Sequence, residues 1–112
     1  MYQFWIPSHF AKQLKPLAKK YRHLKEDIIK TLENFDKRQH TPLGNDTYKI
    51  RLKSSDIQRG KSKSFRMIIY AASADNIIVP FVIYFKGDRE DIGMREINYH
   101  LTMVLLELEA RY

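Results

Sequence analysis

The chain has 112 residues and no cysteine, which excludes disulfides, thiolate zinc sites and a cysteine nucleophile. Its length supports one hydrophobic core, so we expect a single domain over residues 1–112. No segment has the length of a membrane span or the pattern of a signal peptide, and we expect a cytoplasmic protein. The net charge of +7 favours a polyanionic partner, and the alternative is a charged face that only keeps the protein solvated.

The first half of the chain predicts a strand followed by helices. Residues 2–6 are aromatic and β-branched up to Pro7, and Ser8 is placed to cap the next helix. Two apolar stripes at helical spacing predict two helices or one broken helix: Phe10, Leu14, Leu17 and Tyr21, then Leu24, Ile28, Leu32 and Phe35. Pro16 predicts a kink or restart, and residues 40–46 have turn chemistry throughout.

The second half predicts strands and a final helix. Residues 48–53 alternate apolar and basic, as a strand with one buried face does. Residues 65–72 and 77–85 predict an antiparallel hairpin, with Pro80 at an edge or a bulge. A turn centred on Asp75 would place Arg66 opposite Tyr84 and Ser64 opposite Lys86, on one face. Residues 91–110 predict a helix whose apolar stripe is Ile97, Leu101, Val104, Leu105 and Leu108.

Basic residues are concentrated on the central strands and the loop between them. Residues 49–66 contain seven cations against one acid, a net charge of +6, whereas residues 88–112 contain three cations against six acids, a net charge of −3. This asymmetry produces a directed field that suits a polyanion. The seven cations are Lys49, Arg51, Lys53, Arg59, Lys61, Lys63 and Arg66.

Motifs of several common chemistries are missing. The four histidines lack the paired spacing of a metal site, and the sequence around Gly60 lacks the earlier glycine of a phosphate-binding loop. No nucleophile turn is present. His100 lies beside the apolar stripe of the last helix, which favours a structural histidine over a general base. We therefore expect neither a metal nor another cofactor.

The candidate site is a set of polar residues on the predicted strands. It comprises Lys49, Arg51, Arg66, Tyr84 and Lys86, with Arg89 just beyond. A cation among apolar strand residues is costly unless an anion meets it, and an arginine can grip a phosphate with two parallel hydrogen bonds. The alternatives are an ion pair of Arg66 with Glu96 or Asp91, edge charges at Lys49 and Arg51 that deter aggregation, and core packing of Tyr84.

Four segments resemble, in order and spacing, the RelE/ParE superfamily of toxins from type II toxin-antitoxin systems. They are Phe10–Tyr21, Tyr48–Leu52, Arg59–Tyr70 and Ile83–Lys86, and they extend over nearly the whole chain. The resemblance implies an α+β fold of order β-α-α-β-β-β-α, a largely antiparallel sheet packed by two N-terminal helices with a C-terminal helix. Members near RelE and HigB cleave mRNA on the ribosome, whereas ParE-like members poison DNA gyrase.

The resemblance also implies a chemistry and partners. RelE-type enzymes use the 2′-hydroxyl of RNA as nucleophile, so the protein supplies a base, cations and a proton. Lys49 is then the expected base, with a pKa lowered by Arg51, while Arg66 stabilises the phosphate. Tyr84, Lys86 or Arg89 orients the base or protonates the leaving group, and no acid-base pair of the YoeB kind is present. RNA contacts are expected from Lys53, Arg59, Lys61, Lys63 and Arg89, and the partners are an antitoxin, the ribosome and mRNA. A ParE-like gyrase inhibitor and a non-catalytic RNA-binding module are the alternatives.

Overall fold

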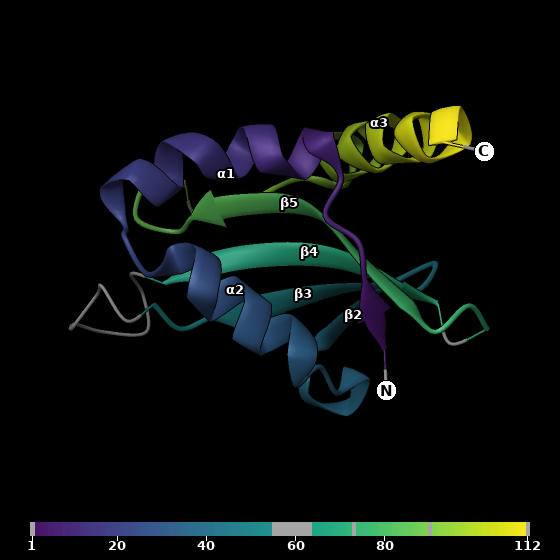
Figure 1. Ribbon diagram of the computed structural model, residues 1–112, viewed down its shortest axis with the longest axis horizontal. Helices are drawn as coiled ribbons and strands as arrows, with labels where there is room; N and C mark the ends of the chain where they lie inside the picture. Colours follow the sequence, from purple (N-terminus) through teal and green to yellow (C-terminus); the bar gives the residue numbers. More distant parts are fainter. Residues whose placement is uncertain (1, 55–63, 73, 90, 112) are drawn as a thin grey trace.

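One five-stranded sheet organises the protein, seen in a computed structural model that describes residues 2–54, 64–72, 74–89 and 91–111 (Figure 1). The strand order is β1-β5-β4-β3-β2, and every pairing is antiparallel except that of β1 with β5. The predicted α+β fold with a largely antiparallel sheet is confirmed. The elements, in chain order, are β1 (Gln3–Phe4), α1 (Ser8–Lys20), α2 (Leu24–Glu33), a 3-10 turn (Lys37–Gln39), β2 (Thr41–Gly44), β3 (Thr47–Leu52), β4 (Phe65–Ala72), β5 (Ile77–Phe85) and α3 (Met94–Arg111).

Strand β2 corrects the prediction that residues 40–46 form only a turn. Thr41–Gly44 pairs with β3 at the edge of the sheet, where a proline such as Pro42 is tolerated. The turn itself is confined to Asn45 and Asp46, which have positive φ, as does Gly44 at the end of β2. Glycine and asparagine adopt this conformation most readily, so the turn chemistry was correctly recognised but assigned to too many residues.

The break between α1 and α2 lies later than predicted. Helix α1 continues through Pro16 to Lys20, and the chain leaves helical geometry at Tyr21. The side chain of Ser8 does not cap α1, which is a second correction. Instead, the amide N–H groups of Ser8 and His9 donate to the carboxylate of Glu107 on α3. A carboxylate at this position also complements the positive end of the helix dipole.

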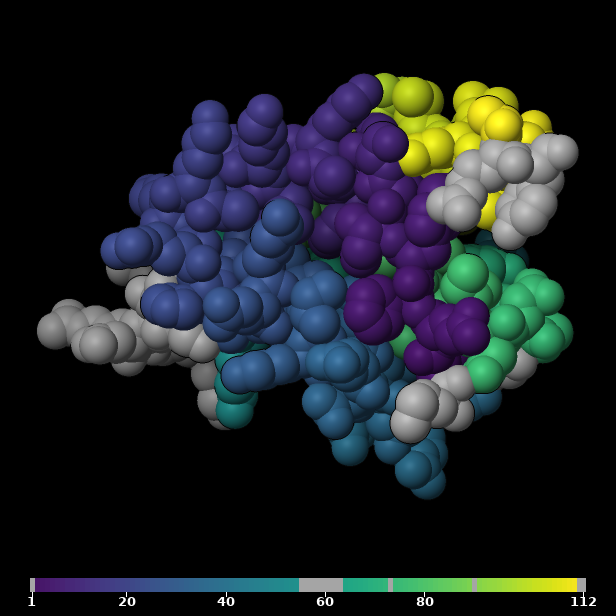
Figure 2. Space-filling model, in the orientation of Figure 1, coloured from purple at the N-terminus to yellow at the C-terminus, as the bar shows by residue number. Residues whose placement is uncertain are grey.

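The two faces of the sheet pack against different helices. Helices α1 and α2 cover one face, and their atoms lie mainly in the left half of the surface seen in Figure 2. They enclose a core of which Phe10, Leu24, Ile28, Met67 and Ile69 are members. Helix α3 contributes to a second cluster on the opposite face, and its members include Ile68, Phe81, Val82, Ile97 and Val104.

Helix α3 begins three residues later than predicted and buries a narrower stripe. Ile97 and Val104 are buried, whereas Leu105, predicted in the same stripe, is 46% exposed. Because only part of α3 contacts the sheet, the neighbouring area of this face remains open to solvent. No helix among residues 2–54, 64–72, 74–89 and 91–111 is long and apolar enough to cross a membrane.

Replacement of Phe10 by alanine is expected to lower the free energy of unfolding by about 3–5 kcal/mol, because it leaves a cavity beneath α1. The matched control is Lys12→Ala on the exposed side of the same helix, which should change stability by less than about 0.5 kcal/mol. Urea denaturation of both variants measures the difference. Equal small losses would mean that α1 is not anchored by Phe10.

The contact between α1 and α3 includes two histidines. His9 Nε2 lies 2.7 Å from His100 Nδ1, and His100 also lies 3.6 Å from the carboxylate of Glu96. Burial, then the proximity of His100, lowers the pKa of His9 from its ordinary value of 6.5, and the charge of Glu107 opposes this shift. His100 thus lies at the contact between α1 and α3.

Stability should therefore fall as the pH drops below 6.5. The unfolded chain takes up a proton at His9 more readily than the folded protein, so the stabilisation is complete above this pH and is lost below it. His9→Gln should reduce the loss of stability between about pH 7 and pH 5. Denaturation midpoints across this range provide the measurement, and identical slopes for both proteins would contradict the assignment.

Candidate functional site

Three predicted site residues lie side by side across the central strands. The pairing registers place Arg51 of β3 beside Arg66 of β4, and Arg66 beside Tyr84 of β5. Lys49 lies two residues before Arg51 and so shares this face of the sheet. We call Lys49, Arg51, Arg66 and Tyr84 the strand cluster. It lies on the side of the sheet that α3 covers in part.

A β-bulge in β5 produces this register. Ile68 pairs with Val82 and Ile69 with Pro80, so Phe81 is an extra residue. The last hairpin pair, Ala72 with Ile77, centres the turn between Ala74 and Asp75 rather than on Asp75. The turn lies earlier in the chain than predicted, and the extra residue in β5 shifts the register back beyond the bulge. The predicted pairing of Arg66 with Tyr84 is therefore confirmed. The prediction of a bulge near Pro80 is also confirmed.

Arg66 is a buried cation. Only 6% of its surface is exposed, and its guanidinium donates to the hydroxyl of Ser64 and to the carbonyl of Phe65 at 3.4 Å. Among the described residues, no carboxylate lies within ion-pair distance of Arg66. Burial and the neighbouring charge of Arg51 lower its pKa, although an arginine remains protonated at neutral pH. The arrangement offers a positive charge that an incoming anion can neutralise.

The predicted alternative for Arg66, an ion pair with Asp91 or Glu96, is absent in the described part of the chain because both acids bind other cations. Asp91 accepts from Lys49 Nζ at 2.8 Å and from the Tyr84 hydroxyl at 3.5 Å. The hydrogen bond from Lys49 is the main cause of a lowered pKa at Asp91. Burial raises the pKa of Tyr84, so its hydroxyl keeps its proton at neutral pH.

Asp91 is the site residue that sequence analysis missed. It was considered only as a partner for Arg66, whereas it contacts Lys49 and Tyr84. Its position just before the last helix was a weak signal, because an acid there is also common as a helix-terminal residue. Only the fold shows that the segment before α3 lies beside the strand cluster.

Arg89 adjoins the strand cluster but is engaged by an acid. Its guanidinium donates two hydrogen bonds to Glu96, at 2.7 and 2.8 Å, and lies 5.7 Å from the centre of the Tyr84 ring. Lys86 follows β5, and its amide N–H donates to the carbonyl of Ser64 at 3.0 Å. Lys53 is exposed just beyond β3. The predicted RNA-binding residues Arg59, Lys61 and Lys63 lie outside the described residues.

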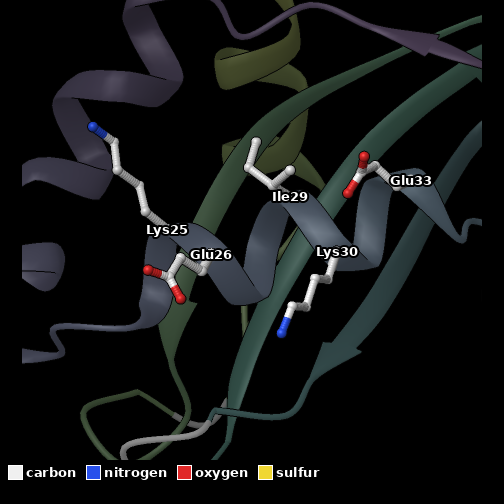
Figure 3. Close-up of a pocket in the computed structure, with 5 residues that line it drawn as sticks. All are labelled: Lys25, Glu26, Ile29, Lys30 and Glu33. Atoms are coloured by element: carbon white, nitrogen blue, oxygen red, sulfur yellow. The ribbon is translucent and has the colours of Figure 1, made fainter.

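A hollow of about 550 Å³ beside α2 lies on the other side of the sheet (Figure 3). All its lining residues come from α2, and its charges cancel because two are lysines and two are glutamates. It therefore does not form a charged site. In the part of the chain that the structure describes, no group of three or more histidine, aspartate or glutamate residues is placed to hold a metal ion.

The fold and the strand cluster together define a small α+β protein whose central strands carry cations on one face of the sheet. Comparison with solved structures specifies the fold further. A double arginine-to-alanine mutant of the Escherichia coli toxin RelE, in the free state, superposes with a TM-score of 0.53 at 19% sequence identity. The match covers 80% of this chain and 87% of that one, so the predicted RelE-like fold is confirmed. No protein-family model and no curated protein matches the sequence.

Arg66→Met should leave the free energy of unfolding unchanged or raise it by about 1 kcal/mol, because an apolar side chain of similar length avoids the desolvation of a buried charge. Arg51→Met, at the exposed neighbouring position, should change stability by less than about 0.5 kcal/mol. Chemical denaturation measures both. A loss above about 2 kcal/mol for Arg66→Met would indicate that Arg66 serves the fold rather than a ligand.

Proposed function

We propose that this protein is the toxin of a type II toxin-antitoxin module and cleaves mRNA on the ribosome. The observation that carries the proposal is the buried Arg66, which lies between Arg51 and Tyr84 and has no carboxylate partner among the described residues. A second support is the fold shared with E. coli RelE, a toxin. A buried cation of this kind can stabilise the negative charge that develops on a phosphate in the transition state of its cleavage.

The proposed reaction needs no nucleophile from the protein. The 2′-oxygen of a ribose forms a bond to the adjacent phosphorus, and the bond from phosphorus to the 5′-oxygen of the next nucleotide breaks. The attacking hydroxyl loses a proton and the leaving oxygen gains one. Arg66 and Arg51 stabilise the extra negative charge that the phosphorus-bound oxygens carry in the transition state.

Lys49 is proposed as the base, on the basis of the family resemblance. Lys49 Nζ lies 2.8 Å from the carboxylate of Asp91, so Lys49 must leave Asp91 before it can act as a base. Tyr84 is the proposed acid, because its raised pKa keeps a proton available on an oxygen inside the cluster. Lys86 lies further along the chain, and Arg89 is held by Glu96.

The proposed partners are ribosomal RNA, mRNA and an antitoxin in the cytoplasm. Lys53 and the basic residues Arg59, Lys61 and Lys63 would guide the protein to RNA phosphates. An antitoxin would be acidic where it covers the strands. Helix α3 exposes Tyr99, Met103 and Leu106, and exposed apolar side chains on one helix support a protein partner there.

The decisive experiment is induced expression of wild type, Arg66→Ala and Arg22→Ala, with mapping of mRNA 5′ ends. Wild type should arrest growth and create new ends inside reading frames. Arg66→Ala should reduce cleavage by about 100-fold or more, because it removes a donor to the transition-state charge. Arg22→Ala removes an exposed charge between α1 and α2 and should behave as wild type.

Two outcomes would replace the proposal by an alternative. Arrest with DNA breaks and no new transcript ends would indicate a gyrase inhibitor. Intact mRNA together with ribosome co-sedimentation that weakens steeply with salt would indicate a non-catalytic RNA-binding module.

A further inference from the structure

The carboxylate of Asp91 is surrounded by donors of the strand cluster. Its Oδ1 atom accepts from Lys49 Nζ at 2.8 Å, from the amide N–H of Ile92 at 2.8 Å and from the Tyr84 hydroxyl at 3.5 Å. Its charge also acts on Arg66 and opposes the lowering of the arginine's pKa. One negatively charged oxygen thus lies where the donors of two strands converge.

The same donors suit an oxygen of a phosphodiester. Carboxylate and phosphate oxygens both carry negative charge and accept hydrogen bonds from ammonium and hydroxyl groups. Two such anions cannot share these donors without repulsion. A phosphate that approaches the strand cluster therefore has to displace the Asp91 carboxylate.

The structure allows this displacement without unfolding. The side chain of Asp91 is 67% exposed, so it can rotate into solvent. Its backbone carbonyl accepts from Arg89 Nε at 3.0 Å, and Arg89 is in turn bound to Glu96. The segment before α3 can therefore remain in place while the carboxylate leaves.

We propose that Asp91 occupies the phosphate-oxygen position of the strand cluster in the free protein and competes with an RNA phosphodiester for Lys49 and Tyr84. This inference rests on the proposed function and adds a residue that sets its specificity. When an isolated phosphate displaces the Asp91 carboxylate, the same donors only exchange one anion for another, so little binding free energy is gained. An RNA strand that makes several further contacts does displace the carboxylate, so the competition selects for an extended and correctly placed substrate.

The test compares Asp91→Asn with Asp88→Asn. Both variants remove one negative charge from the same short segment, but Asp88 is an exposed residue of the turn after β5 and its side chain has no described contact with the strand cluster. The probe is a short single-stranded 2′-O-methyl RNA, which cannot be cleaved by 2′-hydroxyl attack. Binding is measured by fluorescence anisotropy at constant salt, and thermal unfolding verifies that each variant is folded.

Asp91→Asn is expected to tighten binding by about fivefold, the scale of one exposed ion pair, and Asp88→Asn by less than about twofold. Equal effects, or weaker binding by Asp91→Asn, would overturn the competition. Either of these two outcomes would overturn only the competition, and the proposed function would stand if RNA binding still depends on Arg66. An RNA affinity that is unchanged in Arg66→Ala would instead count against the proposed function.

Wild-type protein provides a second measurement that does not depend on a variant. The amide N–H of Ile92 donates to the Asp91 carboxylate, so its NMR signal should shift when the 2′-O-methyl RNA binds. The Gly93 amide lies next along the chain and serves as a reference for general movement of the segment. A signal of Ile92 that stays in place at saturation would show that the carboxylate is not displaced.

Discussion

Burial of one positive charge in the middle of the sheet is the constraint on which the remaining arrangement depends. Arg66 lies on the central strand β4, beside apolar residues on both sides in sequence. A cation there is costly unless polar groups or an anion surround its guanidinium. Ser64 and the carbonyl of Phe65 satisfy part of its hydrogen-bonding capacity. The remainder faces the side of the sheet that α3 leaves partly open.

The two faces of the sheet therefore have different tasks. Helices α1 and α2 cover one face with apolar side chains and form a core cluster with the strands there. On the other face, α3 packs through Ile97 and Val104, and the segment before it lies beside the strand cluster. The core under α1 and α2 supports the fold, and the opposite face displays the charged residues of the strand cluster.

Two acids near the start of α3 form ion pairs with cations of this face. Asp91 holds Lys49, and Glu96 holds Arg89 with two hydrogen bonds. Both contacts are exposed, and exposed ion pairs contribute little to stability. Arg66 differs, because it is buried and not neutralised by any described carboxylate. The site thus combines one buried cation that has no carboxylate partner among the described residues with others that are paired with acids.

Local patterns in the sequence determined much of this protein. Alternation of apolar and basic residues identified β3 and its charged face, and runs of β-branched residues identified β4 and β5 with their correct bounds. Helical spacing identified both N-terminal stripes. These features depend on side-chain periodicity, which a single sequence records. The described parts of the segments that resemble RelE lie mainly in the same elements, and the fold agrees with the resemblance.

Tertiary structure alone decided the features that depend on residues far apart in the chain. Strand β2 exists because an edge of the sheet was available beside β3, and Glu107 caps α1 because α3 packs there. The bulge at Phe81 restored the pairing of Arg66 with Tyr84, which the turn by itself would have shifted. Asp91 is likewise part of the site because of a contact between residues far apart in the chain. Its partner Lys49 is distant in sequence, and only packing of the complete sheet brings the two charges within 2.8 Å.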